Sequence, residues 1–160
     1  MIYVTLGTMF MDFGRLVRKM DEIAVATGEQ VIIQTGLAAT LPRHCEHFDF
    51  KPHADVLALQ ARARLVVAHA GIGVTMDALR CQRPLVLVPR LKRFREHMND
   101  HQVEIAHAVE KRGWGRMALD IDDLDALCKT PPPQVMDYEP DRERLITFIR
   151  QYLEGLASGD

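Results

Sequence analysis

Two glycines at the start of a helix-forming segment are the first candidates for chemistry. Residues 67–75 read Val-Ala-His-Ala-Gly-Ile-Gly-Val-Thr, so an apolar strand runs directly into Gly71 and Gly73. The first N–H groups of a helix have no partner within it and carry partial positive charge, and glycines let a ligand approach them closely. This turn suits a phosphate or pyrophosphate, to which Thr75 would add a hydroxyl. The alternative is a turn whose glycines serve only tight strand-to-helix packing.

This glycine turn differs from two well-known nucleotide-binding sequences. Gly71 and Gly73 begin like the dinucleotide fingerprint, but Met76 stands where the third glycine should be. The acidic residue that such sites carry about 20 residues further on is also missing. The sequence contains no Walker A segment. The pattern therefore disfavours an NAD-binding enzyme and excludes a P-loop NTPase.

Two further polar groups follow predicted strands. Gly7 and Thr8 come after the first strand and would present an N–H and a hydroxyl to the same anion, or form a plain turn. Asn99, Asp100 and Gln102 open a helix after a basic loop. Gln102 carries both a donor and an acceptor, which suits a hydroxyl-rich ligand. Ordinary helix capping by Asp100 is the alternative.

The histidines suggest a metal site only weakly. His97 and His101 have the i, i+4 spacing that can hold zinc on a helix, and residues 44–47 read His-Cys-Glu-His. Neither group has a third ligand at a convincing spacing, so we expect solvated or capping histidines and no metal. His69 lies at a strand end beside the glycines, where it is either a site residue or a core histidine bonded to backbone.

The elements that must position these residues alternate between strands and helices. Apolar runs predict strands at residues 2–6, 30–34, 48–50, 65–68, 85–88 and 116–119, and helical spacing predicts helices at 12–27, 53–63, 71–81, 100–112 and 121–129. This alternation predicts an α/β fold with a mostly parallel sheet. Ligands bind such sheets outside the carboxyl ends of the strands, where the glycine turns are expected.

Composition narrows the class of protein. The 160 residues are 48% hydrophobic and 26% charged, which is typical of one soluble domain with a real core. The net charge of -2 argues against a general nucleic-acid binder. No apolar run approaches the roughly 18 residues of a membrane span, and the amino terminus lacks the pattern of a signal peptide. Three scattered cysteines fit a reducing cytosol.

Three prolines divide the chain near its end. Residues 131–133 are all proline, so we predict a domain over residues 1–130 and a linker over 131–138. Residues 139–160 are predicted to form an amphipathic helix and tail. The apolar stripe of that helix comprises Leu145, Ile146, Ile149, Tyr152, Leu153 and Leu156.

Five segments occur in an order that resembles a known family. They are residues 4–8, 69–75, 77–79, 84–89 and 99–102. Together they resemble the C-terminal, nucleotide-sugar-binding domain of GT-B glycosyltransferases of family 28, which includes the MurG type. The resemblance is strongest to stand-alone half-enzymes: PssE-type exopolysaccharide subunits and the catalytic subunit of the eukaryotic dolichol-linked N-acetylglucosamine transferase. It implies a Rossmann-like parallel sheet flanked by helices, half of a GT-B enzyme.

The resemblance also assigns roles to residues. Asp77 falls where MurG-type enzymes bind the ribose hydroxyls with a glutamate. Among the seven histidines, His69 is the candidate for a catalytic role. The main catalytic base is expected on a partner. The donor diphosphate would contact Gly7, Thr8, Gly71, Gly73 and Thr75, and the donor sugar and diphosphate would contact Asn99, Asp100 and Gln102.

The function implied is that of the donor-binding subunit of a split glycosyltransferase. It would move a hexose-type sugar from a UDP-sugar to a lipid-linked acceptor in polysaccharide synthesis, without metal or cofactor. A membrane-anchored, acceptor-binding subunit would recruit it from the cytoplasm to the inner face of the membrane. In isolation the bare partner face could drive a homodimer. The alternatives are a regulatory nucleotide-sugar-binding module without activity and a fragment of a nucleotide-sugar epimerase.

A basic loop after the fifth predicted strand completes the set of candidates. Its cations are Arg90, Lys92, Arg93 and Arg95, interleaved with Leu91 and Phe94. We predict that this loop faces the acceptor diphosphate and an anionic membrane, because each nearby cation there contributes about 1 kcal/mol. The alternative is a solvated surface loop.

Overall fold

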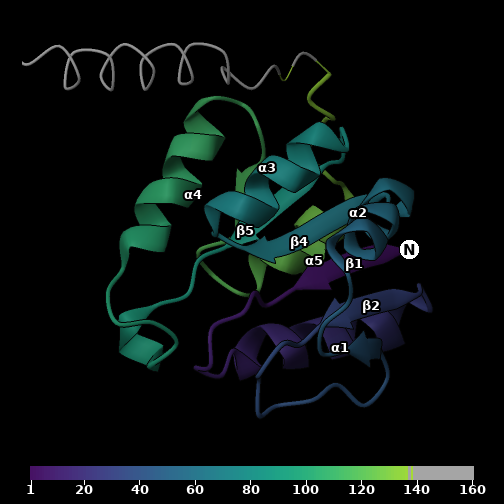
Figure 1. Ribbon diagram of the computed structural model, residues 1–160, viewed down its shortest axis with the longest axis vertical. Helices are drawn as coiled ribbons and strands as arrows, with labels where there is room; N and C mark the ends of the chain where they lie inside the picture. The colour runs from purple at the N-terminus through teal and green to yellow at the C-terminus, as the bar shows by residue number, and fades with distance from the viewer. Residues whose placement is uncertain (137, 139–160) are drawn as a thin grey trace, which may run out of the picture.

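The computed structural model describes residues 1–136 and 138 as a parallel sheet between helices (Figure 1). The strands are β1 (Ile2–Thr5), β2 (Val31–Gln34), β3 (Glu46–Phe48), β4 (Leu65–His69), β5 (Leu85–Val88) and β6 (Arg116–Met117). They form one six-stranded sheet in the order β3-β2-β1-β4-β5-β6, and every pair is parallel. The predicted α/β, Rossmann-like fold is confirmed.

Helices bury both faces of the sheet. They are α1 (Gly14–Thr27), α2 (His53–Arg62), α3 (Ile72–Arg80), α4 (His101–Lys111) and α5 (Asp123–Lys129), with a 3-10 turn, η1, at Lys92–Phe94. One face packs on α1 and α5 around Val4, Leu16 and Leu124. The other packs on α2, α3 and α4 around Tyr3, Ala78 and Ala106. A sheet covered on both faces needs apolar residues at nearly every strand position. The central strands could therefore be predicted from continuous apolar runs in the sequence.

Several predicted boundaries are wrong, among them the start of α5, which is Asp123 and not residue 121. The third strand covers Glu46–Phe48 and not residues 48–50, because an edge strand leaves Glu46 and His47 exposed and so lacks an apolar run. The first helix starts at Gly14, since the Asp12 carboxylate instead accepts hydrogen bonds from the backbone and hydroxyl of Thr40. The last strand ends at Met117 and not at residue 119.

The end of the chain is only partly covered by the structure. Residues 131–136 and 138 form no helix or strand. The helix predicted over residues 139–160 lies outside the described residues. Among the residues described, every helix is too short or too polar to cross a membrane.

The strand order creates a natural ligand site. Proceeding outward from β1, the sheet runs through β2 and β3 in one direction and through β4, β5 and β6 in the other. The chain therefore leaves β1 and β4 toward opposite sides, which opens a crevice at their carboxyl ends. Gly7 follows β1 at this point and Gly71 follows β4.

Candidate functional site

A cavity of about 440 Å³ lies at the carboxyl ends of β1, β2 and β4. It brings together five of the predicted site residues: Gly7, Thr8, His69, Gly73 and Asp77. It also contains residues that the sequence analysis did not select, among them Gln34, Phe50, Lys51, His53, Val56 and Gln60. Three strand ends, the loops after β1 and β3, and helices α2 and α3 thus converge on one hollow at the crevice that the topology predicts.

The two glycines of the turn after β4 serve different purposes. A Cβ on Gly71 would lie 2.3 Å from Nε2 of His69, so this glycine is required by packing. A Cβ on Gly73 would meet no atom within 4 Å. Gly73 is exposed in the first turn of α3 and lines the cavity, so packing does not account for it. It leaves the unpaired N–H groups of the helix open to a ligand, as an anion site requires.

His69 is held as a neutral side chain between two glycines. A Cβ on Gly7 would come within 2.5 Å of its ring, as one on Gly71 would from the other turn. Burial lowers the pKa of His69 to about 4, and the positive charge of Arg90 contributes in the same direction. Its Nδ1 is buried without a hydrogen-bond partner among the described residues. At neutral pH the ring can therefore accept a hydrogen bond, but it is a weak base.

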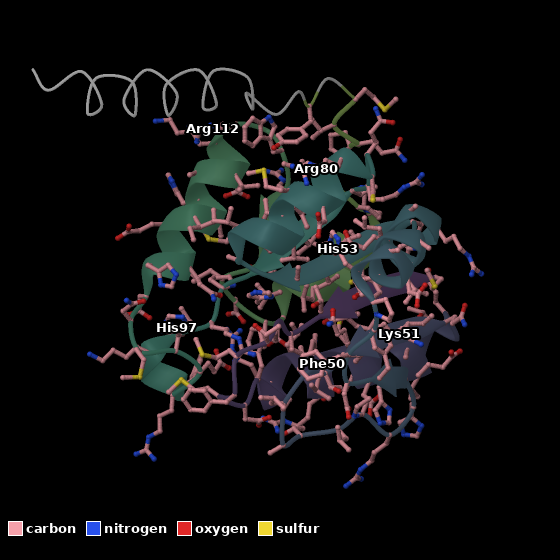
Figure 2. All side chains as sticks on the ribbon, in the orientation of Figure 1. Phe50, Lys51, His53, Arg80, His97 and Arg112 are labelled. Carbon is pink, nitrogen blue, oxygen red and sulfur yellow. The ribbon has the colours of Figure 1, made fainter. Side chains whose placement is uncertain are left out.

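Asp77 and His53 form a polar pair in the same cavity. Nε2 of His53 donates a hydrogen bond to the carboxylate of Asp77, on α3, over 2.8 Å. His53 is the first residue of α2 (Figure 2). The Asp77 side chain is only 15% exposed, and its other oxygen lies 3.8 Å from a guanidinium nitrogen of Arg80. A carboxylate held in this way can accept hydrogen bonds from the vicinal hydroxyls of a ribose.

Phe50 gives the cavity an exposed aromatic face. It lies in the loop between β3 and α2 and is 51% exposed, although it lines the hollow (Figure 2). Neighbouring Lys51 extends over the ring of Phe48, with 4.9 Å from its Nζ to the ring centre. An exposed aromatic face in a ligand cavity can stack on a planar base. The sequence signal that could have located it is an aromatic residue placed directly before a proline-led helix, in Phe50-Lys51-Pro52.

Several predicted site residues lie outside the cavity. Thr75 is fully buried and its hydroxyl donates to the carbonyl of Gly71 at 2.8 Å. Gln102 is 5% exposed, and its Oε1 accepts the N–H of Arg90 at 3.0 Å. Both side chains brace the loops from within. The geometry gives each of them a structural partner, and their predicted contacts with the ligand stay predictions.

The segment that opens α4 is organised by its own side chains. Asp100 stands at the N-cap position, but its carboxylate accepts the N–H of Lys92 at 2.8 Å and does not cap the helix. Asn99 accepts the backbone N–H of His101 at 3.3 Å. These two residues are exposed at the same edge of the sheet as the cavity without lining it. Their predicted contact with the donor sugar stays a prediction.

The basic loop is split between an interior and an exterior. Arg90 is 1% exposed, so its predicted place on an acceptor-facing or membrane-facing surface is wrong. Its guanidinium donates to the carbonyls of Leu6, Met11, Asp12 and Glu96. Leu91 is buried as well. Lys92, Arg93 and Arg95 are exposed as expected.

An ion pair holds this loop against α1. Arg15 Nε donates to Glu96 at 2.8 Å, and the second Glu96 oxygen accepts the N–H of Leu91. Glu96 is 4% exposed. His97 and His101, whose spacing alone could hold zinc, stack edge to face with their ring centres 4.6 Å apart. Within the described part of the chain, His, Cys, Asp and Glu form no group of three or more suited to a metal.

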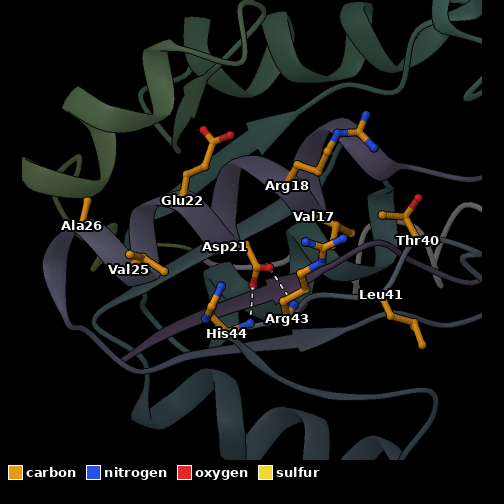
Figure 3. A pocket seen from close by; sticks show the side chains of 10 residues that line it. All are labelled: Val17, Arg18, Asp21, Glu22, Val25, Ala26, Thr40, Leu41, Arg43 and His44. Atoms are coloured by element: carbon orange, nitrogen blue, oxygen red, sulfur yellow. Dashed lines mark hydrogen bonds between the residues drawn. The ribbon is translucent and has the colours of Figure 1, made fainter.

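A larger cavity, of about 670 Å³, lies away from the strand ends between α1 and residues 40–44 (Figure 3). Asp21 points toward its wall and accepts the backbone N–H groups of Arg43 and His44 at 2.6 and 3.0 Å. This carboxylate is thus occupied in holding the loop. The smaller cavity is the better candidate, because it contains the glycine turns.

Comparison with known proteins shows which family the sequence matches. The sequence model of the family described as "Glycosyltransferase family 28 C-terminal domain" matches residues 1–130. A curated relative, the uncharacterized UDP-glucosyltransferase YojK of Bacillus subtilis, is 25% identical over 139 residues, covering 85% of this chain. The chain spans only 32% of the length of that relative.

Solved structures share the fold. The NMR structure of ALG13 has a TM-score of 0.60 and 21% identity, covering 90% of this chain and 93% of ALG13. The crystal structure of Acinetobacter baumannii MurG has a TM-score of 0.54 and 16% identity, covering 80% of this chain and 40% of MurG. At these identities the likeness shows the fold, which is that of GT-B C-terminal domains.

Proposed function

The chain belongs to the glycosyltransferase family 28 C-terminal domain family, and from this we propose that it is the donor-binding subunit of a split glycosyltransferase. The donor is a UDP-sugar carrying a hexose-type sugar. The acceptor is a lipid-linked glycan presented by a separate, membrane-anchored subunit in polysaccharide synthesis. The observation that carries the proposal is the cavity at the carboxyl ends of β1 and β4, with the open Gly73 at its helix end.

The cavity suits the charge that develops in sugar transfer. As the glycosidic bond to the donor breaks, the leaving nucleoside diphosphate gains negative charge. The N–H groups at the start of α3, unobstructed at Gly73, are placed to stabilise that charge together with Gly7 and Thr8. This electrostatic stabilisation needs no metal ion, so we propose a metal-independent reaction.

The catalytic base is proposed to come from the partner. A base must take the proton of the acceptor hydroxyl as the new bond forms. Two histidines line the cavity: His53 is paired with the Asp77 carboxylate, and His69 has a pKa of about 4, which makes it a poor proton acceptor at neutral pH. We assign His69 a hydrogen bond to the donor and assign the proton transfer to a group on the acceptor-binding subunit.

Exposed apolar side chains in the segments after β1, β4 and β5 support the proposal of a partner. Phe10, Ile72, Phe94 and Met98 are each more than half exposed. They lie in the segments that follow β1, β4 and β5 at their carboxyl ends. Large apolar side chains gathered on one edge are typical of a protein interface. In the isolated chain the same edge would account for a homodimer.

The similarity to ALG13 also supports a split enzyme. The match covers 93% of the ALG13 chain, whereas it covers 40% of MurG. A nucleotide-sugar-binding module without activity is the second candidate, since the cavity could bind a donor without a base of its own.

The test is reconstitution with a candidate membrane-anchored partner. The purified chain should bind UDP in titration calorimetry and transfer no sugar alone. Co-expressed with the partner, it should transfer sugar from a UDP-sugar to a polyprenyl-diphosphate glycan, and EDTA should leave the rate unchanged. Robust transfer by the chain alone would exclude the split enzyme. A chain that binds no UDP would exclude donor binding altogether.

A further inference from the structure

The side chain of Gln34, at the carboxyl end of β2, is oriented by two hydroxyl groups. The Tyr3 hydroxyl donates to Gln34 Oε1 at 2.9 Å, and the Thr5 hydroxyl donates to the same oxygen at 3.1 Å. Thr5 Oγ1 in turn accepts the N–H of Gly7 at 3.3 Å, which leaves its own proton for Gln34. Both hydroxyls therefore use the carbonyl end of the amide, and its N–H2 end is directed elsewhere.

The hydroxyl of Tyr3 stays protonated and so remains a hydrogen-bond donor. The side chain is fully buried, and this burial raises its pKa above the ordinary value for a tyrosine. The phenol therefore keeps its proton throughout the pH range of a folded protein, and Gln34 Oε1 is its partner among the described residues. A fixed donor on one end of an amide determines which end faces outward.

The free end of the Gln34 amide is available to a ligand. Gln34 lines the cavity and is partly exposed, and its Nε2 makes no hydrogen bond within residues 1–136 and 138. The chain after Gln34 runs beside the segment that leads to Phe50, since Gly36 N–H donates to the carbonyl of Asp49 at 3.2 Å. A Cβ on Gly36 would lie 3.7 Å from the ring of Phe50. The oriented amide and the exposed aromatic ring thus line the same part of the cavity.

We propose that the Gln34 amide donates to the C4 carbonyl of the nucleotide base and so selects a uridine over a cytidine nucleotide. The inference rests on the proposed function, in which this cavity holds a nucleotide-sugar. An amide of fixed orientation discriminates only at an atom that is an acceptor in one nucleotide and a donor in another. In pyrimidines two positions switch in this way: the C4 substituent, a carbonyl oxygen in uracil and an amino group in cytosine, and N3, a donor in uracil and an acceptor in cytosine. A donor amide at the C4 substituent favours uridine, whereas the same amide at N3 would favour cytidine, so a preference for CDP would also contradict the proposal. The amino group would face the Gln34 N–H2 donor to donor, which a site built for a hydrogen bond rejects strongly.

The test compares UDP with CDP as ligands of the full chain in titration calorimetry. Wild type should prefer UDP by about tenfold or more, the cost of one unmade hydrogen bond in a site that requires it. Gln34→Glu keeps the shape but offers only acceptors, so the UDP-to-CDP ratio should fall by about tenfold. Gln134→Glu makes the same change on an exposed residue outside the cavity and should leave the ratio unchanged. Tyr3→Phe removes one of the two orienting donors and should lower the ratio by about threefold.

Each outcome decides the inference. If Gln34→Glu weakens UDP and CDP equally, Gln34 contacts a part that both ligands share, and the inference is wrong. A wild type that does not distinguish UDP from CDP contradicts it as well. If wild type binds neither nucleotide, the proposed function fails together with the inference, whereas UDP binding with an unchanged ratio in the variants removes the inference alone. Should Gln34→Glu fail to fold in thermal melts, an unchanged ratio in folded Tyr3→Phe would overturn it.

Discussion

The loops that follow β4 and β5 leave neighbouring strands at the same edge of the sheet. One exposes its backbone, whereas the other buries two charged side chains. After β4, the exposed Gly73 leaves the first N–H groups of α3 open. After β5, the side chains of Arg90 and Glu96 turn inward and bond to other parts of the chain. The loop after β4 exposes backbone N–H groups to a ligand. The loop after β5 is the frame: its buried side chains, Arg90 and Glu96, hold the neighbouring segments in position.

This difference explains why local sequence is a better guide to one loop than to the other. The role of Gly73 follows from its neighbours in the sequence, because a strand, a glycine and a helix start define it locally. The role of Arg90 depends on carbonyls 79 and 84 positions away, at Met11 and Leu6. Grouping Arg90 with Lys92 and Arg93 by adjacency therefore placed a buried residue on the surface.

The largest expected effect is on the frame. Arg90→Met should reduce the free energy of unfolding by about 3 kcal/mol, because buried carbonyls of Leu6 and Met11 lose their donor. Arg93→Met, on an exposed residue of the same loop, should change it by less than about 0.5 kcal/mol. Urea unfolding measures both. Equal stability of the two variants would show that the hydrogen bonds of Arg90 do not stabilise the fold.

The second prediction separates the two glycines of the other loop. Gly73→Val should lower UDP affinity by more than about tenfold with little change in melting temperature, since its side chain enters open space in front of the N–H groups. Gly71→Ala should instead lower the melting temperature, because its Cβ would overlap the His69 ring.

Thermal melts beside titration calorimetry distinguish these effects. If Gly73→Val lowers the melting temperature and leaves UDP affinity unchanged, the glycine is required for packing and not for binding.

Much of the fold was accessible from the sequence, and the errors have a common cause. The buried strands were found because both faces of the sheet are covered, whereas β3 was misplaced because an edge strand need not be apolar. Thr75 and Gln102 have the residue types of ligand contacts, but their partners are backbone groups supplied by the fold. His53 and Phe50 went unselected, because only the folded chain brings them beside Asp77 and Gly73.

The third prediction concerns pH and the buried His69, the last residue of β4, whose ring lies between Gly7 and Gly71. Its pKa is lowered to about 4 from an ordinary 6.5, so the unfolded chain binds more protons between these values. Its contribution to stability is fully present above pH 6.5 and is lost as the pH falls toward 4. Between pH 6.5 and 5, wild type should lose about 2 kcal/mol more than His69→Gln. Chemical unfolding at these two pH values measures the difference, and parallel losses would mean that His69 is not held neutral.

The smallest expected effect per residue falls on the exterior of the loop after β5. Lys92 and Arg93 are exposed beside Phe94, whereas the interior of this loop is closed by Arg90 and Glu96. If these cations meet the phosphates of the acceptor or the membrane, each contributes about 1 kcal/mol. Lys92→Glu combined with Arg93→Glu should therefore reduce transfer by the assembled enzyme and its binding to vesicles containing an anionic phospholipid.

Two controls tie this result to the comparison of the loops. UDP binding by the double variant should be unchanged, because neither residue lines the donor cavity, and its melting temperature should match wild type. Raising the salt concentration should weaken vesicle binding of wild type more than that of the double variant, since exposed charges are screened. Survival of both transfer and vesicle binding after the double charge reversal would make the exterior a solvated surface, and the loop after β5 would then serve only as the frame for the glycine turn beside it.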